Sequence, residues 1–415
     1  MYLKEITEEE FDKFTKAYFI KSIYQTKEYA HVMYNQGFSF KYIGFVIDNK
    51  IIGASLILIK KINRLIAFAP RGILIDYSKY NIDDVTNLLK EYLNKLNISS
   101  LKINPIILKN IYNYKKESLI TNPYYDNIFL KLTNSGFKHL GYNNYFESLK
   151  PRFEAIIDLN DSIENLFKNI KKEYRTKIRS AIKNGIKVYK GNIDVLDKLY
   201  EFNKDKYIRD LNYYKDAYNY FNFSDMIDIY YTKIDFKIYL QTIQNTLNYY
   251  LEIEDKLNNK LTNKNKNSKK LIDKKMNNDI IISEYKNKLI EATNLLKKEN
   301  SAITSVAIVI KQNDTATILI DGYDLKYKKF NSKHLLIWQL IEIYKNKNYK
   351  KFNLGGLSNT SKDTTNYSGL NLFKLNFGSK VYEYSGDFEL SLNKKNYNFY
   401  RNYIPIKNIL KTQKK

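Results

Sequence analysis

The sequence is poor in the residues that build most metal sites and nucleophilic sites. It contains no cysteine among 415 residues, which excludes disulfides, thiolate zinc sites and cysteine nucleophiles. Its three histidines, at positions 31, 139 and 334, include no pair at ligand spacing, so neither a histidine metal site nor a Ser-His-Asp triad is expected. The sequence therefore predicts chemistry that uses no metal and no cofactor.

Long apolar runs are missing as well. The longest, from Ile51 to Ile59, is far too short to span a bilayer. The first residues, MYLKEITEEEFDKF, are acidic where a signal peptide is basic and then apolar. We therefore expect a cytoplasmic protein, which could associate transiently with the inner surface of the membrane.

Arginine is rare although the chain is strongly basic. The net charge of +25 points toward a polyanionic partner, but lysine, asparagine, isoleucine and tyrosine are all abundant, so part of the charge reflects a general compositional bias. Only seven of the 69 cationic residues are arginine. Where arginine persists, a planar fork that binds an anion through two hydrogen bonds is the more specific explanation.

The first half of the chain alternates strand and helix patterns. Two apolar runs joined by Asp48-Asn49 indicate a hairpin, and a third run ends at Pro70-Arg71-Gly72. A stretch with helical periodicity and another strand follow. These segments are Tyr42–Ile47, Lys50–Ile59, Leu65–Ala69, Asn81–Leu96 and Ser100–Ile103. The pattern predicts an α+β domain that closes near Glu147.

The second half repeats this order around a helical insertion. A strand at Glu154–Asp158, an N-cap at Ser162 and a helix at Lys171–Asn184 are followed by a helical stretch at Ile193–Arg209. Residues 234–300 carry two helical apolar patterns separated by the polar turn Asn263–Ser268, which predicts an antiparallel coiled-coil arm. Strands and a helix then return, at Thr304–Lys311, Ala316–Ile320, Ser332–Asn346 and Lys351–Leu354.

One predicted helix carries a row of cations. Lys172, Arg175, Arg179 and Lys183 lie three or four residues apart, so they share one face of the helix. A solvated lysine-rich face is one interpretation, and an anion-binding face is the other. Two of the seven arginines lie on this row, which gives the anion-binding interpretation equal weight.

The stretch from Asn353 to Leu390 concentrates glycine. It holds five of the 14 glycines, including Gly355, Gly356 and Gly378, and such density marks close approach of the backbone to a ligand. Within it, Lys374 lies between Phe373 and Phe377. A lysine here can stabilise a developing oxyanion, and the phenylalanines can stack on a base. The alternative is an ordinary core with a solvated lysine.

In this order, the motifs resemble those of the FemABX peptidoglycan-bridge aminoacyltransferases over nearly the whole chain. The matching pieces are Gln25 with Tyr29, Ala69–Gly72, Ile103–Pro105, Pro151–Phe153, Arg175–Gly185, Arg209-Asp210, Asn353–Gly356, Phe373-Lys374 with Phe377-Gly378, and Gly386–Phe388. Each piece alone is weak, whereas the ordered set with a helical insertion is specific.

The resemblance implies an α+β fold of two tandem acetyltransferase-like (GNAT) domains, residues 1–148 and residues 149–233 with 301–415, and a helical arm at 234–300. It implies transfer of glycine, serine or alanine from aminoacyl-tRNA to an amine of the peptidoglycan precursor, either lipid II or UDP-MurNAc-pentapeptide. It associates Lys374 with the aminoacyl end of the tRNA, together with Phe373, Phe377 and the nearby glycines. It associates Arg209 and Tyr213 with the precursor.

Two positions depart from the family pattern. Asn104, which we expect among the precursor-binding residues, stands where an aspartate, a candidate base, is frequent, and an amide takes no proton at neutral pH. Met33 replaces a frequent lysine. Because no base is assigned, we expect the tRNA hydroxyl to assist proton transfer. Arg71, at a strand end, suits a carboxylate or phosphate of the precursor, or else a structural ion pair.

Two other functional classes stay open. An acyl-CoA-dependent N-acetyltransferase would share the fold, but the chain has no Q/R-x-x-G-x-G/A turn to hold a pyrophosphate. A non-catalytic RNA-binding protein would fit the positive charge and the arm, but it would leave the lysine and the glycine cluster unused.

Overall fold

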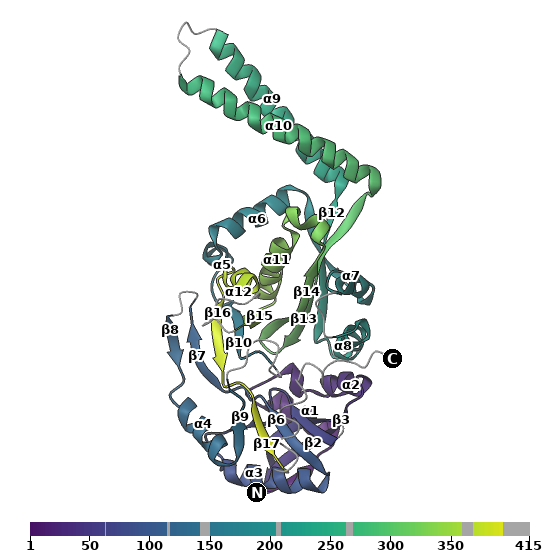
Figure 1. Cartoon of the computed structure of the whole chain (residues 1–415), viewed down its shortest axis with the longest axis vertical. Coiled ribbons are helices and arrows are strands. Elements are labelled where there is room, and N and C mark those ends of the chain that lie inside the picture. The colour runs from purple at the N-terminus through teal and green to yellow at the C-terminus, as the bar shows by residue number, and fades with distance from the viewer. Residues whose placement is uncertain are drawn as a thin grey trace.

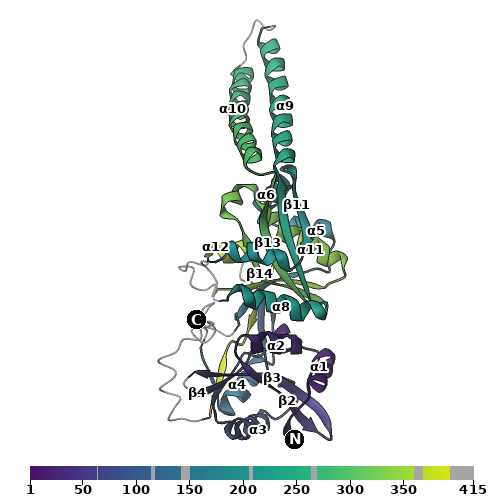
Figure 2. The same ribbon diagram turned by 90° about the vertical axis from the view of Figure 1, so that its right-hand side faces the viewer.

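The computed structural model describes residues 1–62, 64–113, 117–141, 150–204, 209–262, 269–358 and 368–392. Two mixed sheets lie end to end in an elongated body, and a pair of long helices projects from the end farthest from the N-terminus (Figure 1). Figure 2 shows these two helices side by side along their length. The expected α+β class is confirmed.

The first sheet has the strand order β1-β2-β3-β4-β6-β17-β9, with β5 paired to β3. The hairpin expected at Asp48-Asn49 joins β2 to β3, and both turn residues have positive φ, as a two-residue hairpin turn requires. The strands are β1 (Tyr2–Glu5), β2 (Ser39–Ile47), β3 (Lys50–Ile62), β4 (Arg64–Ala69), β5 (Leu74–Ile75), β6 (Ile98–Ile103), β9 (Phe137–His139) and β17 (Phe388–Ser391).

The second sheet has nine strands in the order β11-β12-β13-β14-β15-β10-β16-β7-β8. Its centre is antiparallel except where β14 runs parallel to β15. The strands are β7 (Leu108–Tyr112), β8 (Ser118–Thr121), β10 (Phe153–Asp158), β11 (Ile186–Gly191), β12 (Ile227–Asp235), β13 (Ser301–Gln312), β14 (Thr315–Tyr323), β15 (Lys351–Leu357) and β16 (Lys380–Tyr384).

The two sheets exchange strands. β7 and β8 come from the first third of the chain but pair with β16 of the second sheet. In return β17, near the C-terminal end of the described residues, pairs with β6 and β9 of the first sheet. The predicted domain boundary between residues 148 and 149, and the predicted domain end at Glu147, lie outside the described residues. Strands from each side of this boundary belong to the sheet of the other side.

Helices cover both sheets and join them. α2 packs on α8, and one apolar cluster contains Tyr29 and Tyr213 of these helices together with Phe68 of the first sheet and Val306 of the second. The helices are α1 (Glu8–Ala17), α2 (Lys27–Asn35), α3 (Ile82–Lys95), α4 (Tyr125–Asn134), α5 (Ile163–Asn169), α6 (Lys172–Lys183), α7 (Leu196–Glu201), α8 (Leu211–Phe223), α9 (Phe236–Thr262), α10 (Lys269–Lys298), α11 (Ser332–Asn346) and α12 (Ser368–Leu375), with short 3-10 turns η1 (Ile23–Gln25), η2 (Ile193–Val195) and η3 (Leu325–Phe330).

The arm is the antiparallel pair α9 and α10, as the periodicity predicted; its polar turn, Asn263–Ser268, lies outside the described residues. α9 has 27 residues, which corresponds to about 40 Å of helix. Its first turns are not free of the body, because Phe236, Tyr239 and Ile243 belong to the core of the second sheet. The part of the arm beyond these residues projects.

The expected helix at Ile193–Arg209 was wrong in extent. The chain forms η2 and α7, which ends at Glu201, and a separate helix, α8, begins after Asp210. The side chain of Asp210 caps α8 by accepting a hydrogen bond from the backbone N–H of Tyr213.

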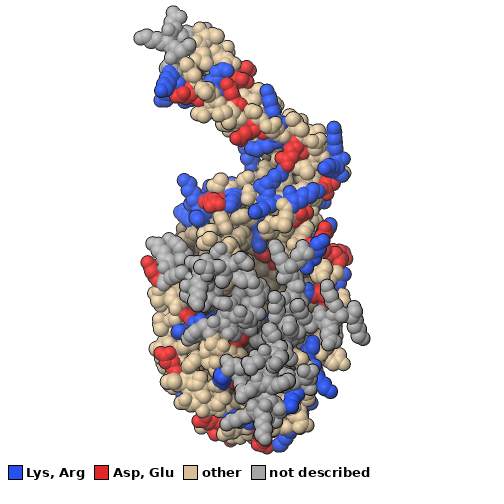
Figure 3. Space-filling view, viewed as in Figure 1, with Lys and Arg blue, Asp and Glu red and all other residues tan. Residues whose placement is uncertain are grey.

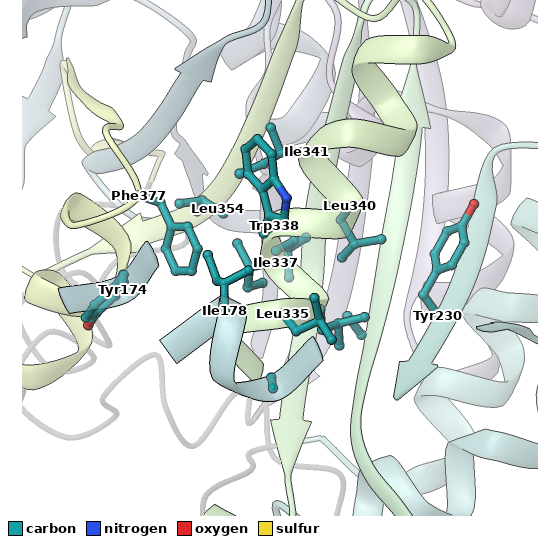
Figure 4. Packing of buried hydrophobic residues seen from close by; sticks show 14 of the residues in the cluster. Tyr174, Ile178, Tyr230, Leu335, Ile337, Trp338, Leu340, Ile341, Leu354 and Phe377 are labelled. Carbon is teal, nitrogen blue, oxygen red and sulfur yellow. The ribbon is translucent and has the colours of Figure 1, made fainter. Parts of the chain in front are cut away.

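The core of the second sheet holds the C-terminal motif in place. α11 presents its apolar side to the sheet, and α6 packs on α11. Figure 4 shows Ile178 of α6 close to Leu335 and Ile337 of α11, with Phe377 beside them. α12, which follows the glycine-rich strand β15, therefore has one side fixed by the core.

Candidate functional site

The Pro70-Arg71-Gly72 turn is fixed by a buried glutamine. The Gln25 side chain accepts a hydrogen bond from the backbone N–H of Leu56 at 2.8 Å and donates one to the Pro70 carbonyl at 2.9 Å. A Cβ at Gly72 would lie 2.9 Å from Gln25 Nε2, so only glycine fits against this clamp. Two pieces of the sequence pattern, Gln25 and the turn, are therefore one structural unit.

Arg71 leaves this turn and enters the second sheet. Its backbone is left-handed, with φ 57°, and its side chain is 4% exposed. The guanidinium donates to the Pro151 carbonyl at 3.0 Å and to the carboxylate of Glu154 on β10, and it lies over the Tyr384 ring. Its second terminal nitrogen, Nη1, is buried without a partner among the described residues.

Glu154 links Arg71 to the glycine-rich strand β15. Asn353 donates from Nδ2 to the Glu154 carboxylate at 2.8 Å, and its side-chain oxygen accepts from the Gly355 backbone N–H at 2.8 Å. Gly355 has φ 84°, a conformation that favours glycine. The carbonyl of the next residue, Gly356, accepts a hydrogen bond from Lys374 Nζ at 2.7 Å. A continuous chain of contacts thus joins Arg71 to Lys374.

Lys374 is a half-buried cation with a lowered pKa. Burial, the main cause, brings the pKa of its ammonium down to about 8; the charge of Asp321 opposes this shift and that of Lys333 adds to it. Lys333 pairs with Asp321 at 2.8 Å and lies over the Phe373 ring. At neutral pH most Lys374 side chains are charged, which suits stabilisation of a developing oxyanion.

The two phenylalanines beside Lys374 have different surroundings. Phe377 is 1% exposed and packs edge-on against Tyr174 in the core, so its ring has no free face for a base. Phe373 is only partly buried and remains a candidate for stacking. A Cβ at Gly378 would lie 3.1 Å from the Asn169 carbonyl, so this glycine permits the turn after α12 to pack closely on the end of α5.

Arg209 and Tyr213 lie beside two further cations, which no sequence motif marks. The Arg209 guanidinium lies over the Tyr213 ring at 4.6 Å. Arg209 also helps burial to lower the pKa values of Lys60 and Lys150, which places the three cations near one another. Lys150 Nζ lies 3.2 Å from the centre of the Tyr24 ring. We call Lys60, Lys150 and Arg209 the cationic group.

Asn104 is fully buried and contacts a carboxylate. Its Nδ2 donates to Asp387 Oδ1 at 2.5 Å, and Asp387 is itself fully buried. Asp387 belongs to the segment between β16 and β17, so the contact lies where the C-terminal segment enters the first sheet. Asn104 follows the last residue of β6, Ile103, which pairs with Ala69 just before the Arg71 turn.

The cations of α6 form a surface next to the arm. Lys172, Arg179 and Lys183 are exposed, and Arg175 is half-buried. Figure 3 shows Lys and Arg side chains gathered over this edge of the body and at the base of the arm, on both sides of the hollow between them. A surface of this shape and charge suits the backbone of a nucleic acid.

The described histidines and carboxylates form no metal centre. Among the described residues, no group of three His, Cys, Asp or Glu side chains is placed to hold a metal ion. Burial lowers the pKa of His334 to about 4, so this imidazole beside Phe373 is neutral at pH 7. No described helix is both long and apolar enough to cross a membrane.

Comparison with known proteins identifies the family. The model of the FemAB family matches residues 6–403. The chain is 24% identical to the lipid II:glycine glycyltransferase of Staphylococcus haemolyticus, over 94% of this chain and 92% of that protein. It is 27% identical to the aminoacyltransferase FemB of Staphylococcus epidermidis, over 99% and 100% respectively.

A solved structure supports the same assignment of the fold. The crystal structure of FemX superposes with a TM-score of 0.72 at 20% identity, and the match covers 96% of this chain and 100% of that one. The resemblance that the ordered motifs predicted is confirmed, and the chain is a member of the FemAB family of aminoacyltransferases.

Proposed function

We propose that this aminoacyltransferase transfers glycine from glycyl-tRNA to an amine of the stem peptide of lipid II, and so builds the peptidoglycan cross-bridge. The observation that carries the proposal is the held ammonium of Lys374, at the end of a chain of contacts between the two sheets. The choice of glycine and of lipid II follows the names of relatives that span nearly the whole chain.

The acceptor side of the site uses the cationic group. Arg209, Lys60 and Lys150 have no ion-pair partner among the described residues, and Tyr24 and Tyr213 supply aromatic faces beside them. Lipid II carries a diphosphate and a stem carboxylate, and clustered cations with a planar guanidinium suit such anions. Arg71 Nη1, which is buried without a described partner, is a further donor toward the precursor.

The donor side uses α12, α6 and the arm. Phe373 offers a ring for the terminal adenine of the tRNA, and a base stacked on an aromatic ring gains roughly 1–3 kcal/mol. The exposed cations of α6 and the arm base then follow the phosphate backbone. We therefore propose that the row Lys172, Arg175, Arg179 and Lys183 binds tRNA rather than the precursor.

The chemistry is aminolysis of an ester. The neutral stem amine attacks the glycyl carbonyl carbon, the carbonyl oxygen becomes an oxyanion, and the Lys374 ammonium stabilises that charge. The C–O bond to the tRNA ribose then breaks. The proton lost by the amine passes to the leaving ribose oxygen through the neighbouring ribose hydroxyl, so the protein needs no dedicated base.

Transfer of label tests the proposal. The protein would be incubated with lipid II in vesicles and with tRNA charged with radiolabelled glycine, serine or alanine, each in a separate reaction. Label in lipid II from glycyl-tRNA supports the proposal. Parallel reactions replace lipid II by soluble UDP-MurNAc-pentapeptide, or the charged tRNA by acetyl-CoA. Label from another aminoacyl-tRNA would change the proposed amino acid, and label only in the soluble precursor would change the proposed acceptor. Acetyl transfer would replace the proposed donor. RNA binding with no transfer would overturn it.

A further inference from the structure

The contact chain to Lys374 passes through Glu154, a residue that no sequence motif marks. Its side chain is 17% exposed and pairs with Arg71, which is 4% exposed. A carboxylate that is largely removed from water costs folding energy unless cations and donors compensate it. Here Arg71 holds one oxygen and Asn353 donates to the other, so both oxygens are committed and the orientation of the carboxylate is fixed.

The backbone around Glu154 is also adapted to this position. β10 pairs with β15 in a register that places Glu154 opposite Gly356, and the register shifts between Glu154 and Ile156. Two residue steps of β10 lie opposite three steps of β15, from Gly356 to Asn353, so the extra residue of this bulge lies in β15. Across the bulge, Asn353 lies within hydrogen-bond distance of the Glu154 carboxylate. Asn353 in turn holds the backbone N–H of Gly355.

We propose that Glu154 is a positioning residue for the reaction: held by Arg71 of the first sheet, it orients Asn353 and the Gly355–Gly356 backbone, and so fixes the place of Lys374 Nζ. The inference rests on the role given to Lys374 under the proposed function. Under this proposal, the relative position of the two sheets, which the Arg71–Glu154 pair links, determines the position of Lys374 Nζ. The negative charge of Glu154 also favours the charged form of Lys374.

A first experiment reads the position of Lys374 without any substrate. Trace acetic anhydride acetylates neutral amines, and mass spectrometry gives the rate at Lys374 in the free protein at pH 7. In Glu154→Gln, Lys374 loses a nearby negative charge, so its pKa falls and more of the amine is neutral. The Gly356 carbonyl, which accepts its hydrogen bond, is also no longer held in place. Both changes increase the reactivity of Lys374. We expect acetylation at least about twofold faster than in the parent protein. An unchanged rate would overturn the proposal, whether or not transfer activity has been found.

The matched control is Glu383→Gln. Glu383 is a buried carboxylate of the same sheet that pairs with Arg152, so its loss imposes a similar structural penalty without touching the chain to Lys374. We expect an unchanged acetylation rate at Lys374 in this variant. If both variants accelerate acetylation equally, general loosening of the sheet explains the result and the proposal fails.

Kinetics provide the second test. Loss of a residue that orients a metal ligand typically costs roughly 10- to 100-fold in activity, and we expect a similar cost for a residue that orients Lys374. Glu154→Gln should lower kcat by this amount, but its partner Arg71 is itself a proposed precursor contact, so KM for lipid II is judged in a second variant. Asn353→Ala, which leaves the Arg71–Glu154 pair in place, should lower kcat equally and keep KM for lipid II within about twofold. In kcat the double variant should be no worse than either single variant, since both break one chain. Additive losses, or an effect on KM alone, would contradict the proposal.

Discussion

The lowered pKa of Lys374 makes its role testable by pH. A lysine whose pKa is about 8 is roughly 90% charged at pH 7 and roughly 10% charged at pH 9. The pKa is lowered, so the cation is present below pH 8 and is lost as pH rises through this value. Arginine keeps its charge over the whole range. The charge supplied at the site should therefore fall about tenfold from pH 7 to pH 9 in the parent protein but not in Lys374→Arg.

The assay measures single-turnover transfer of glycine with saturating glycyl-tRNA and lipid II between pH 6.5 and pH 9.5. Spontaneous ester hydrolysis is measured without protein and subtracted. Because the attacking amine also titrates, the informative quantity is the ratio of the parent rate to the Lys374→Arg rate. We expect this ratio to be constant below about pH 7 and to fall about tenfold by pH 9. A ratio that does not change with pH would refute the proposal that the charge of Lys374 stabilises the oxyanion.

A stability measurement separates this effect from unfolding. A pKa lowered from 10.5 to about 8 means that the fold disfavours the charged lysine by about 3 kcal/mol. The hydrogen bond to Gly356 returns about 1.5–3 kcal/mol. Lys374→Met should therefore change the free energy of unfolding at pH 7 by less than about 2 kcal/mol in urea denaturation, while activity falls by roughly 10²–10³. If the free energy of unfolding falls by much more than this, the low activity of Lys374→Met reflects unfolding and is no evidence about the mechanism.

Three further predictions follow from the ion pairs and surfaces. Arg71→Ala leaves the Glu154 carboxylate without its cation, and we expect a loss of about 3–5 kcal/mol in urea unfolding; a loss below about 1 kcal/mol would mean that water replaces the arginine. Replacing residues 251–284 by a short glycine-serine turn should raise KM for glycyl-tRNA and leave KM for lipid II unchanged, because this part of the arm lies beyond the core residues of α9; an unchanged KM for tRNA would make the arm structural only. Lys183→Glu should weaken tRNA binding and reduce the slope of log affinity against log salt by about 1, whereas Lys95→Glu, on α3 at the opposite end of the molecule, should do neither; equal effects would indicate nonspecific charge.

Local patterns in the sequence predicted most elements of the fold. The hairpin at Asp48-Asn49, the cap at Ser162 and the helix Ser332–Asn346 all depend on turn chemistry, capping and periodicity within a few residues. The strand β12 was missed because Asp228 interrupts its apolar pattern. In the fold this aspartate is buried beneath Lys190, Lys311 and Tyr344, which are partners that no local pattern reveals.

The exchange of strands could not be read from the sequence. β17 and β8 have four residues each, and the preference of a short strand depends on the neighbours it pairs with rather than on its own composition. The partners of β17 are β6, almost 300 positions earlier, and β9. A helix start at Asp210, in contrast, carried a readable signal, because an aspartate precedes an apolar pattern there.

The sequence predicted the motifs of the site but not the contacts that connect them. Gln25, the Pro70–Gly72 turn, Asn353 and Lys374 were each selected from the sequence, but their common link, Glu154, resembles any polar strand residue. Lys60 and Lys150 were missed for a related reason: lysine is abundant everywhere in this chain, so only the fold distinguishes those that lie beside Arg209. The placement of Phe377 in the core likewise depends on packing between segments distant in sequence.

The central claim is that this chain moves glycine from tRNA to lipid II. The most direct measurement is mass spectrometry of lipid II after incubation with the protein and glycyl-tRNA, with Lys374→Met as the matched control. We predict a product heavier by one glycine residue on the stem peptide, formed at least roughly 100-fold more slowly by the variant. Unmodified lipid II with the parent protein, under conditions where glycyl-tRNA survives, would contradict the account.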